Sequence, residues 1–233
     1  MPTFHWRRPL FSHTPAVLAA AATTLAIAAI LTGCGGGGPG PSAIGATEPI
    51  VGLPCEGCEA VFQGKPATLL PRSRIAPATE PGQPMRIEGT VVDRSGRRTP
   101  GVIVYAYQTN AQGVYPTDEQ FRGQAAFRHG RLRAWVQTDE NGRYTFDTIR
   151  PGGYPNTDLP EHAHMHIIEV GRCTYYIDDV MFEDDPRLTA LMLTRLVAGR
   201  GGSRIATPRR DASDVQVVTR DIVLGERIPG YPG

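Results

Sequence analysis

Lysine is almost absent from this chain of 233 residues, because Lys65 is the single one and arginine supplies every other basic side chain. An excess of either charge is also absent, since 24 basic residues face 23 acidic ones and the net charge is +1. A nucleic-acid-binding protein needs a basic excess or a basic stripe. The charge balance therefore gives no electrostatic case for a nucleic-acid partner.

No apolar run is long enough for a comfortable membrane span of about 20 residues. The uncharged apolar stretch Ala16–Leu31 follows a short basic start and has the length typical of a signal peptide. Leu31 to Cys34 then resembles a bacterial lipobox, which implies cleavage before Cys34 and a lipid on its thiol. An ordinary signal peptide with an incidental cysteine is the alternative. We therefore expect an exported protein that a lipid on Cys34 anchors on the periplasmic or cell-surface side of a bacterial membrane.

Cysteine is scarce, with four in the chain. Once Cys34 carries the lipid, a lone Cys-x-x-Cys pair and one further cysteine remain, which excludes a four-cysteine zinc site. In an oxidising compartment we expect a disulfide between two of the three, and the sequence leaves the pairing of Cys55, Cys58 and Cys173 open. We divide the chain into a signal peptide (1–33), a lipidated cysteine with a flexible tether (34–53), an N-terminal extension (54–84) and one domain (85–233).

Short β-type runs separated by turn residues fill the chain from about Met85 onward. Such a series predicts an all-β, antiparallel β-sandwich. Asn141-Gly142 lies between two runs, which is the pattern of a tight hairpin. Apolar residues at helical spacing predict one short helix over 186–198, with its Met and Leu stripe in the core. The expected strands are 87–92, 102–107, 132–138, 143–149, 162–170, 174–182 and 215–224.

Three histidines stand within five residues, at His162, His164 and His166. Alternate residues of a strand share a face, so all three imidazoles should point the same way and two neighbours could hold one metal ion. A polar strand face open to solvent is the alternative. His129 lies among arginines, and we expect it in a solvated basic loop.

Two tyrosines, Tyr115 and Tyr154, follow stretches rich in glycine and turn residues, where functional side chains collect on a rigid scaffold. A neutral phenol is a poor metal ligand, but a hard and highly charged cation stabilises the phenolate. Tyrosine ligands therefore indicate ferric iron more than zinc or copper. Simple packing is the alternative for either tyrosine alone.

Five blocks of the sequence run in the order seen in intradiol ring-cleavage dioxygenases, the family of protocatechuate and catechol dioxygenases. The blocks are 89–93, 107–115, 138–146, 148–155 and 160–164. The resemblance extends from about Arg86 to Tyr231. It looks closest to the extracytoplasmic branch, which shows a stretch like 171–179 and an upstream Cys-Glu-Gly-Cys.

This resemblance implies a mononuclear, non-haem ferric ion held by two tyrosines and two histidines. Tyr115 and Tyr154 match the tyrosine ligands, and Tyr154 matches the one that leaves the metal when substrate binds, which makes it the expected catalytic residue. The histidine pair stays open between His162 with His164 and His164 with His166. A proline two residues before His162 favours the first pair, with His166 as the alternative ligand.

The activity that the resemblance implies is cleavage of a catechol-type aromatic by O2 to a muconate-type diacid. Members of the family commonly form homo-oligomers, and the resemblance extends that expectation to this protein. The family carries an arginine just before its proline, whereas this chain has Leu159 there, or Glu161 in the other register. Arg131, Arg133 and Arg150 are the candidates to replace that charge. An iron-binding relative without turnover and a transthyretin-like or carboxypeptidase regulatory-like binding module are the alternatives.

Overall fold

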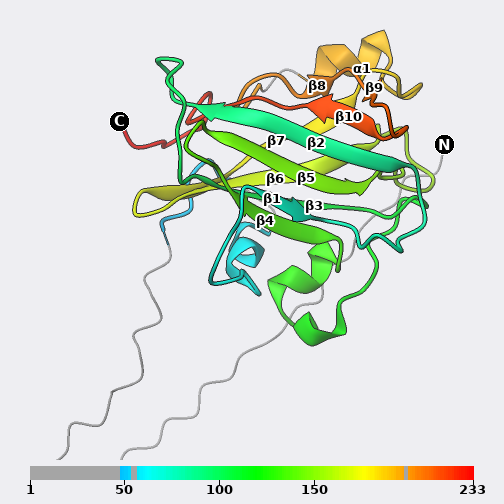
Figure 1. Cartoon of the computed structure of the whole chain (residues 1–233), viewed down its shortest axis with the longest axis horizontal. Helices are drawn as coiled ribbons and strands as arrows, with labels where there is room; N and C mark the ends of the chain where they lie inside the picture. The colour runs from blue at the N-terminus through cyan, green and yellow to red at the C-terminus, as the bar shows by residue number, and fades with distance from the viewer. Residues whose placement is uncertain (1–47, 54–56, 197–198) are drawn as a thin grey trace, which may run out of the picture. The chain divides into compact units, whose positions relative to one another are not determined.

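The computed structural model describes residues 48–53, 57–196 and 199–233. Two β-sheets pack against each other (Figure 1). The first sheet has the strand order β1-β5-β2-β10-β9, with β11 also pairing with β2, and the second has the order β4-β3-β6-β7-β8. The predicted all-β sandwich with one short helix is confirmed. The expected signal peptide, lipidated Cys34 and most of the tether lie outside the described residues.

Most of the expected strands form close to their predicted bounds, and the last expected run divides into β10 and β11. The strands β1, β8 and β9 were not predicted, because two or three residues give no recognisable period. The first sheet contains β1 (Arg72–Arg74), β2 (Pro84–Val92), β5 (Arg143–Ile149), β9 (Arg209–Arg210), β10 (Gln216–Thr219) and β11 (Ile222–Val223). The second contains β3 (Ile103–Gln108), β4 (Arg133–Gln137), β6 (His162–Glu169), β7 (Cys173–Phe182) and β8 (Ile205–Ala206).

Both sheets are mixed, because β1 pairs with β5, β10 and β11 with β2, and β8 with β7 in parallel, while the other pairings are antiparallel. The hairpin expected at Asn141-Gly142 is wrong, since β4 and β5 belong to different sheets. The Asp139 carboxylate accepts hydrogen bonds from the backbone N–H groups of Asn141 (2.9 Å) and Arg143 (2.8 Å). That local turn carries the chain from one sheet to the other.

The main core lies between the sheets and is built from alternate residues of each strand. Ile87 on β2, Phe146 on β5, Val104 on β3 and Met165 on β6 have no exposed surface. Each such side chain stabilises the fold by about 1.5–3 kcal/mol relative to exposure. This core makes the second sheet a rigid platform for what lies on its outer face.

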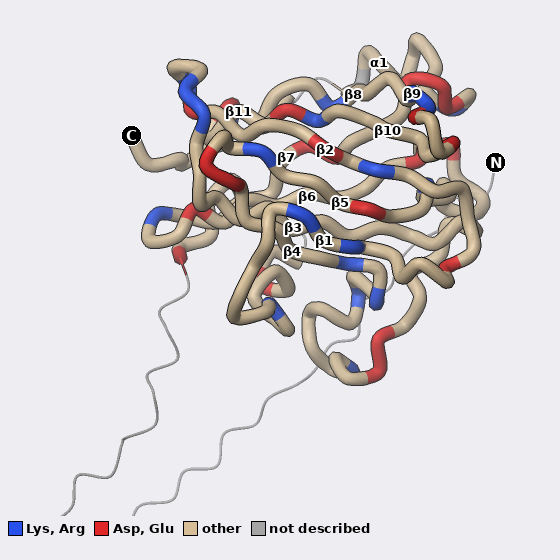
Figure 2. The backbone as a smooth tube through the Cα atoms, in the orientation of Figure 1, with Lys and Arg blue, Asp and Glu red and all other residues tan. Residues whose placement is uncertain are grey.

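The outer face of the first sheet is polar, with basic and acidic residues alternating across β1, β5 and β2 (Figure 2). The Asp147 carboxylate accepts from Arg72 on one side (2.7 Å) and from Arg86 on the other (3.3 Å). Arg86 continues to Asp211 at 3.4 Å. These cross-strand ion pairs tie the short strand β1 to the sheet.

The helix α1 (Ala190–Arg195) begins at Thr189, whose hydroxyl accepts from the N–H of Met192 at 3.2 Å. Of the expected stripe, Leu191 is 62% exposed, and Leu188, Met192 and Leu196 are only half-buried. The expectation that the apolar stripe of this helix belongs to the core is therefore wrong. Among the described residues, no helix has the length and apolar character needed to cross a membrane.

The outer face of the second sheet is covered by two short 3₁₀ helices, η1 (Cys58–Phe62) and η3 (Ala125–His129), which contact each other; η2 (Glu119–Phe121) lies just before η3. They are the cyan and green coils near β4 in Figure 1. The indole of Trp135 on β4 donates to the carbonyl of Val61 in η1 at 2.7 Å. Cys58 at the start of η1 is disulfide-bonded, whereas Cys173 on β7 is a buried free thiol.

Candidate metal centre

Tyr115 is positioned by a compact turn that follows β3. The Asn110 side chain accepts from the N–H groups of Gln112 and Val114, both at 3.0 Å, which closes the turn. Gly113 has a φ of 76°, a conformation that favours glycine. The turn therefore sends the chain back over the outer face of the second sheet, with Tyr115 half-buried there.

Tyr154 is positioned by the loop between β5 and β6, which is fastened to the Tyr115 turn. Thr109 donates to the carbonyl of Gly152 at 2.7 Å, and the N–H of Gly152 donates to the carbonyl of Asn110 at 2.9 Å. A Cβ on Gly113 would collide with the carbonyl oxygen of Gly153. The two loops thus approach at backbone distance, which only glycine permits.

The three histidines occupy one face of β6, as the alternation predicts. Ala163 and Met165 point into the main core from the other face. The ring centroid of His162 lies 4.7 Å from that of His164 and 5.1 Å from that of Tyr154. Nδ1 of His166 instead lies 3.6 Å from Sγ of Cys58, under η1. The structure therefore brings His162 and His164, rather than His166, beside Tyr154.

Four potential ligands converge at this place. The hydroxyl oxygens of Tyr115 and Tyr154 are 2.5 Å apart. Nε2 of His164 lies 2.8 Å from the first and 3.1 Å from the second. Nδ1 of His162 is occupied by the carbonyl of Pro160 at 2.7 Å, which leaves Nε2 as its available ligand atom.

The donor set fits a hard trivalent cation. Burial, reinforced by the neighbouring Tyr154, raises the pKa of Tyr115 far above its usual value, so the phenol stays protonated in the absence of a cation. Burial also lowers the pKa of His162 and keeps its imidazole neutral, the form that binds metals. Two phenols and two imidazoles would suit ferric iron, whose charge offsets the cost of forming buried phenolates.

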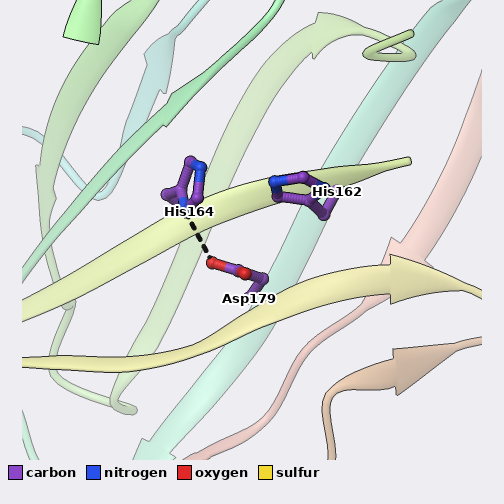
Figure 3. A group of neighbouring side chains, drawn as sticks. All are labelled: His162, His164 and Asp179. Atoms are coloured by element: carbon purple, nitrogen blue, oxygen red, sulfur yellow. Dashed lines mark ion pairs between the residues drawn. The ribbon is translucent and has the colours of Figure 1, made fainter. Parts of the chain in front are cut away.

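Asp179 on β7 supports His164 from the side away from the tyrosines. Its carboxylate lies 2.8 Å from Nδ1 of His164 (Figure 3) and accepts from the Tyr176 hydroxyl at 2.6 Å. Burial raises the pKa of Asp179, but the adjacent His164 outweighs that effect and holds the pKa low. A carboxylate behind a histidine is the usual way to fix the tautomer of a metal ligand.

The side chains of His162, His164 and Asp179 could also form a three-ligand group of their own, since their ligand atoms lie within 4.8 Å of one another. Two histidines and a carboxylate are a known ferrous iron set. However, Nε2 of His164 faces both tyrosines, while Nδ1 faces the carboxylate at hydrogen-bond distance. The geometry thus favours the tyrosine side for the metal, with Asp179 behind it.

A small hollow opens beside the converging ligands. It measures about 130 Å³, well below the 300–1,000 Å³ of sites for drug-sized ligands. A larger hollow of about 650 Å³ around Arg94 and Arg172 contains none of the four converging residues, so size alone does not mark the site. The small hollow is lined by Gly57, Tyr107, Tyr115, Arg128, His129, Tyr154 and His164.

His129 and Tyr107 also line the small hollow, although the sequence alone assigns neither a functional role. The expectation of a solvated His129 is wrong, because it is 3% exposed and stacks on Tyr107 at 3.7 Å between ring centroids. Tyr107 stacks in turn on His164 at 4.5 Å. Arg128 and Arg131 beside it are exposed, so the charged residues next to His129 in the sequence concealed its burial. Only the alternation of β3, which puts Tyr105 and Tyr107 on one face, could have indicated this aromatic wall.

The three arginines considered as replacements for a charge at Leu159 are all engaged by other groups. Their partners are Glu161 and Asp184 for Arg150, Glu80 for Arg131, and the rings of Phe121 and Trp135 for Arg133. Arg187 instead fills the space beside the residue before Tyr154, because a Cβ on Gly153 would collide with its Nη1.

The fold and the converging side chains define a β-sandwich with a candidate metal site lined by tyrosines and histidines. A family model described as Dioxygenase matches residues 66–224. The protocatechuate 3,4-dioxygenase beta chain of Burkholderia cepacia is 31% identical over 121 residues, which are 46% of this chain and 48% of that one. Chlorocatechol 1,2-dioxygenase of Rhodococcus opacus is 33% identical over 144 residues, 55% of this chain and 52% of that one.

Among solved structures, the dioxygenase domain of a dioxygenase–carbohydrate-binding fusion from Streptomyces sp. SirexAA-E is similar in fold. Its TM-score is 0.51 at 24% identity, over 68% of this chain and 90% of that one. The chain belongs to the intradiol dioxygenase family, whose model accounts for more than half of its residues. It spans about half the length of the two curated relatives described above.

Proposed function

We propose that this protein cleaves a catechol-type aromatic with O2, between its two hydroxyl-bearing carbons, using a non-haem ferric ion. The observation that carries the proposal is the convergence of Tyr115, Tyr154 and Nε2 of His164 within 3.1 Å of one another, with His162 beside them. The names of two relatives, a protocatechuate and a chlorocatechol dioxygenase, support the same substrate class.

In this proposal Tyr115, Tyr154, His162 and His164 hold the ion. A bound ferric ion would act as a Lewis acid that lowers the pKa of the diol and orients it. Both oxygen atoms of O2 enter the product, so a catechol gives a muconate-type diacid and no external reductant is needed.

The side chains have separate tasks around the substrate. Tyr154, as the phenolate that a bound ferric ion would stabilise, would accept a proton from a substrate hydroxyl, and its oxygen adjoins both Tyr115 and His164. The imidazoles of His162 and His164 stay in place, held from behind by the Pro160 carbonyl and the Asp179 carboxylate. The rings of Tyr107 and Tyr115 line the small hollow in which the substrate would lie.

The test is a visible spectrum of the protein from residue 35 onward, loaded with ferric iron and mixed with catechols. We expect a tyrosinate-to-iron charge-transfer band that shifts with catechol, followed by uptake of one O2 per catechol. Tyr154→Phe and Tyr115→Phe should weaken or abolish the band. Tyr231→Phe is the matched control, because it removes a phenol that bonds Glu169 outside the cluster.

Two outcomes would count against the proposal in different ways. A colourless protein without stoichiometric iron contradicts the metal site itself. A coloured protein that shifts with catechol but consumes no oxygen describes an iron-binding relative that has lost turnover.

We further propose that the protein is exported and anchored by a lipid on Cys34. The order of basic start, apolar run and cysteine supports this location. Metabolic labelling with a fatty-acid analogue should mark the full chain but not Cys34→Ser. Label that persists in Cys34→Ser would contradict the anchor.

A further inference from the structure

His129 is held rigidly in the wall of the small hollow. It is the last residue of η3 and 3% exposed, and its ring lies parallel to that of Tyr107 within 3° at 3.7 Å. Nδ1 lies 2.8 Å from the hydroxyl of Tyr105, a residue with no exposed surface. The stacking on Tyr107 and the hydrogen bond to Tyr105 together fix the His129 ring in one orientation.

The hydrogen bond to Tyr105 determines which nitrogen of His129 carries the proton. Burial raises the pKa of Tyr105 more than the nearby Arg133 lowers it, so the phenol keeps its proton. Among the described residues, Nδ1 of His129 is the one acceptor that this buried hydroxyl has. Buried donors are almost always satisfied, so the hydroxyl donates to Nδ1.

The proton of the imidazole is therefore on Nε2. Burial lowers the pKa of His129 to about 3, so the ring is neutral at physiological pH and carries one N–H. Within the described part of the chain Nε2 has no hydrogen-bond partner, and the ring lines the small hollow. The wall at Gly57 is close, because a Cβ there would collide with Nε2. A single, neutral N–H is thus presented at this end of the hollow.

The ring of Tyr107 forms the wall between His129 and the converging metal ligands. Tyr107 stacks on His129 at 3.7 Å and on His164 at 4.5 Å, so one ring separates His129 from the converging metal ligands. A catechol with its two oxygens at those ligands would direct its far side toward His129. The volume of about 130 Å³ leaves no room for a large additional group.

We propose that Nε2–H of His129 donates a hydrogen bond to an oxygen on the far side of the substrate ring, and that the site selects single-ring catechols carrying such an acceptor. A carboxylate or a further hydroxyl opposite the diol would meet this need. A methyl group at the same place would leave the N–H without a partner, which costs binding energy. This inference rests on the proposed ring-cleavage function and adds a specificity-determining residue to it.

The test measures binding without turnover, in ferric-loaded protein under anaerobic conditions, by the shift of the tyrosinate band. The ligands are catechol, 4-methylcatechol, 3,4-dihydroxybenzoate and benzene-1,2,4-triol. In the wild type we expect each oxygen-bearing ligand to bind at least 10-fold more tightly than 4-methylcatechol. In His129→Leu that ratio should fall to about one, while the Kd for catechol changes by less than threefold.

His129→Gln is the conservative variant, because its amide N–H can replace Nε2–H, and it should recover part of the preference. Tyr105→Phe removes the hydrogen bond that keeps the proton of His129 on Nε2. It should therefore also reduce the preference for oxygen-bearing ligands, while the diol site stays intact. A long-range ¹H–¹⁵N correlation spectrum of the metal-free protein should show Nδ1 of His129 unprotonated. This spectrum needs no iron and no activity.

The outcomes separate this inference from the proposed function. If the four ligands shift the band with equal affinity in the wild type, the role of His129 is refuted and the dioxygenase proposal stands. If none of them shifts the band, the proposed function fails. If His129→Leu does not fold, the wild-type preference and the two other variants still decide.

Discussion

The two ring nitrogens of His164 have different neighbours, phenols on one side and a carboxylate on the other, and these neighbours determine which nitrogen can bind a metal ion. Nε2 faces the phenols of Tyr115 and Tyr154, while Nδ1 lies against the carboxylate of Asp179. The carboxylate accepts the Nδ1–H proton, which leaves the Nε2 lone pair for a metal ion. The buried negative charge of Asp179 behind the ring also makes Nε2 a stronger electron-pair donor to a metal ion.

Asp179→Asn should therefore weaken ferric iron binding by about 10–100-fold, the usual effect of losing such a partner. The amide keeps the shape but removes the charge, and it can hold the ring in the wrong tautomer. Competition with a chelator of known affinity would measure the loss.

Tyr176→Phe is the matched control, because it removes the other hydrogen bond of Asp179 and leaves its charge in place. Its effect on iron affinity should be several-fold smaller. Equal affinity in Asp179→Asn and the wild type would show that the carboxylate does not support the metal site.

At the scale of elements, the two tyrosines meet because two loops touch through glycines. Gly113→Ala should separate these loops, since its Cβ would collide with the carbonyl oxygen of Gly153. We expect loss of the tyrosinate band with the sandwich still folded.

Gly96→Ala controls for backbone strain. Gly96 has a φ of 83° and nothing within 4 Å of a Cβ, so both variants bear a similar cost of about 1–2 kcal/mol for a left-handed conformation. Visible absorption of the iron-loaded variants compares them directly. Equal bands in both variants would mean that the loop contact does not position the tyrosines.

The first sheet offers a test of its charged face. Asp147→Asn removes the carboxylate shared by Arg72 and Arg86. Because Arg72 is largely exposed, we expect a loss of only about 1 kcal/mol in the free energy of unfolding. Chemical denaturation near pH 7 measures the difference.

The sign of the pH dependence follows from the same contacts. Burial raises the pKa of Asp147, but its two arginines outweigh that effect and lower the pKa below its unfolded value. The stabilisation is therefore present above about pH 4, the unfolded pKa, and is lost as pH falls further. A difference between variant and wild type that persists unchanged at pH 3 would contradict this origin.

For the whole molecule, the sequence was informative where signals are local. Alternation over β3, β5 and β7 predicted the sandwich, and His162, His164 and His166 fell on one face as expected. The sheet to which a strand belongs depends on distant partners, so the Asn141-Gly142 turn was misread as a hairpin. Short edge strands such as β8 form only because a neighbour is already in place.

The candidate site shows the same division. Tyr115, Tyr154 and the histidine strand were predicted from residue types and order. The supporting residues were not, because Asp179 and His129 reach the site only through tertiary packing. Part of the small hollow is lined by loop residues, and loops have no periodic sequence pattern from which such positions could be predicted.

Burial of uncharged histidines makes the stability of the whole metal-free protein sensitive to mild acid. Burial lowers the pKa of His129 to about 3, and it also lowers the pKa of His162 and His166. In the unfolded chain these groups titrate near 6.5. The unfolded state therefore binds more protons, so stability is complete above about pH 6.5 and falls as pH drops toward the folded pKa values.

Between pH 6 and 4.5 most carboxylates stay ionised, so this window isolates the histidines. His129 alone should cost about 1.4 kcal/mol per pH unit there, measured as the free energy of unfolding in urea, and His162 and His166 should add to that slope. His129→Gln cannot gain a proton and should reduce the slope by about 1.4 kcal/mol per pH unit. A free energy that stays constant from pH 6.5 to 4.5 would show that these imidazoles are hydrated and protonated in the folded protein, and it would remove the rigid, neutral His129 on which the specificity of the pocket depends.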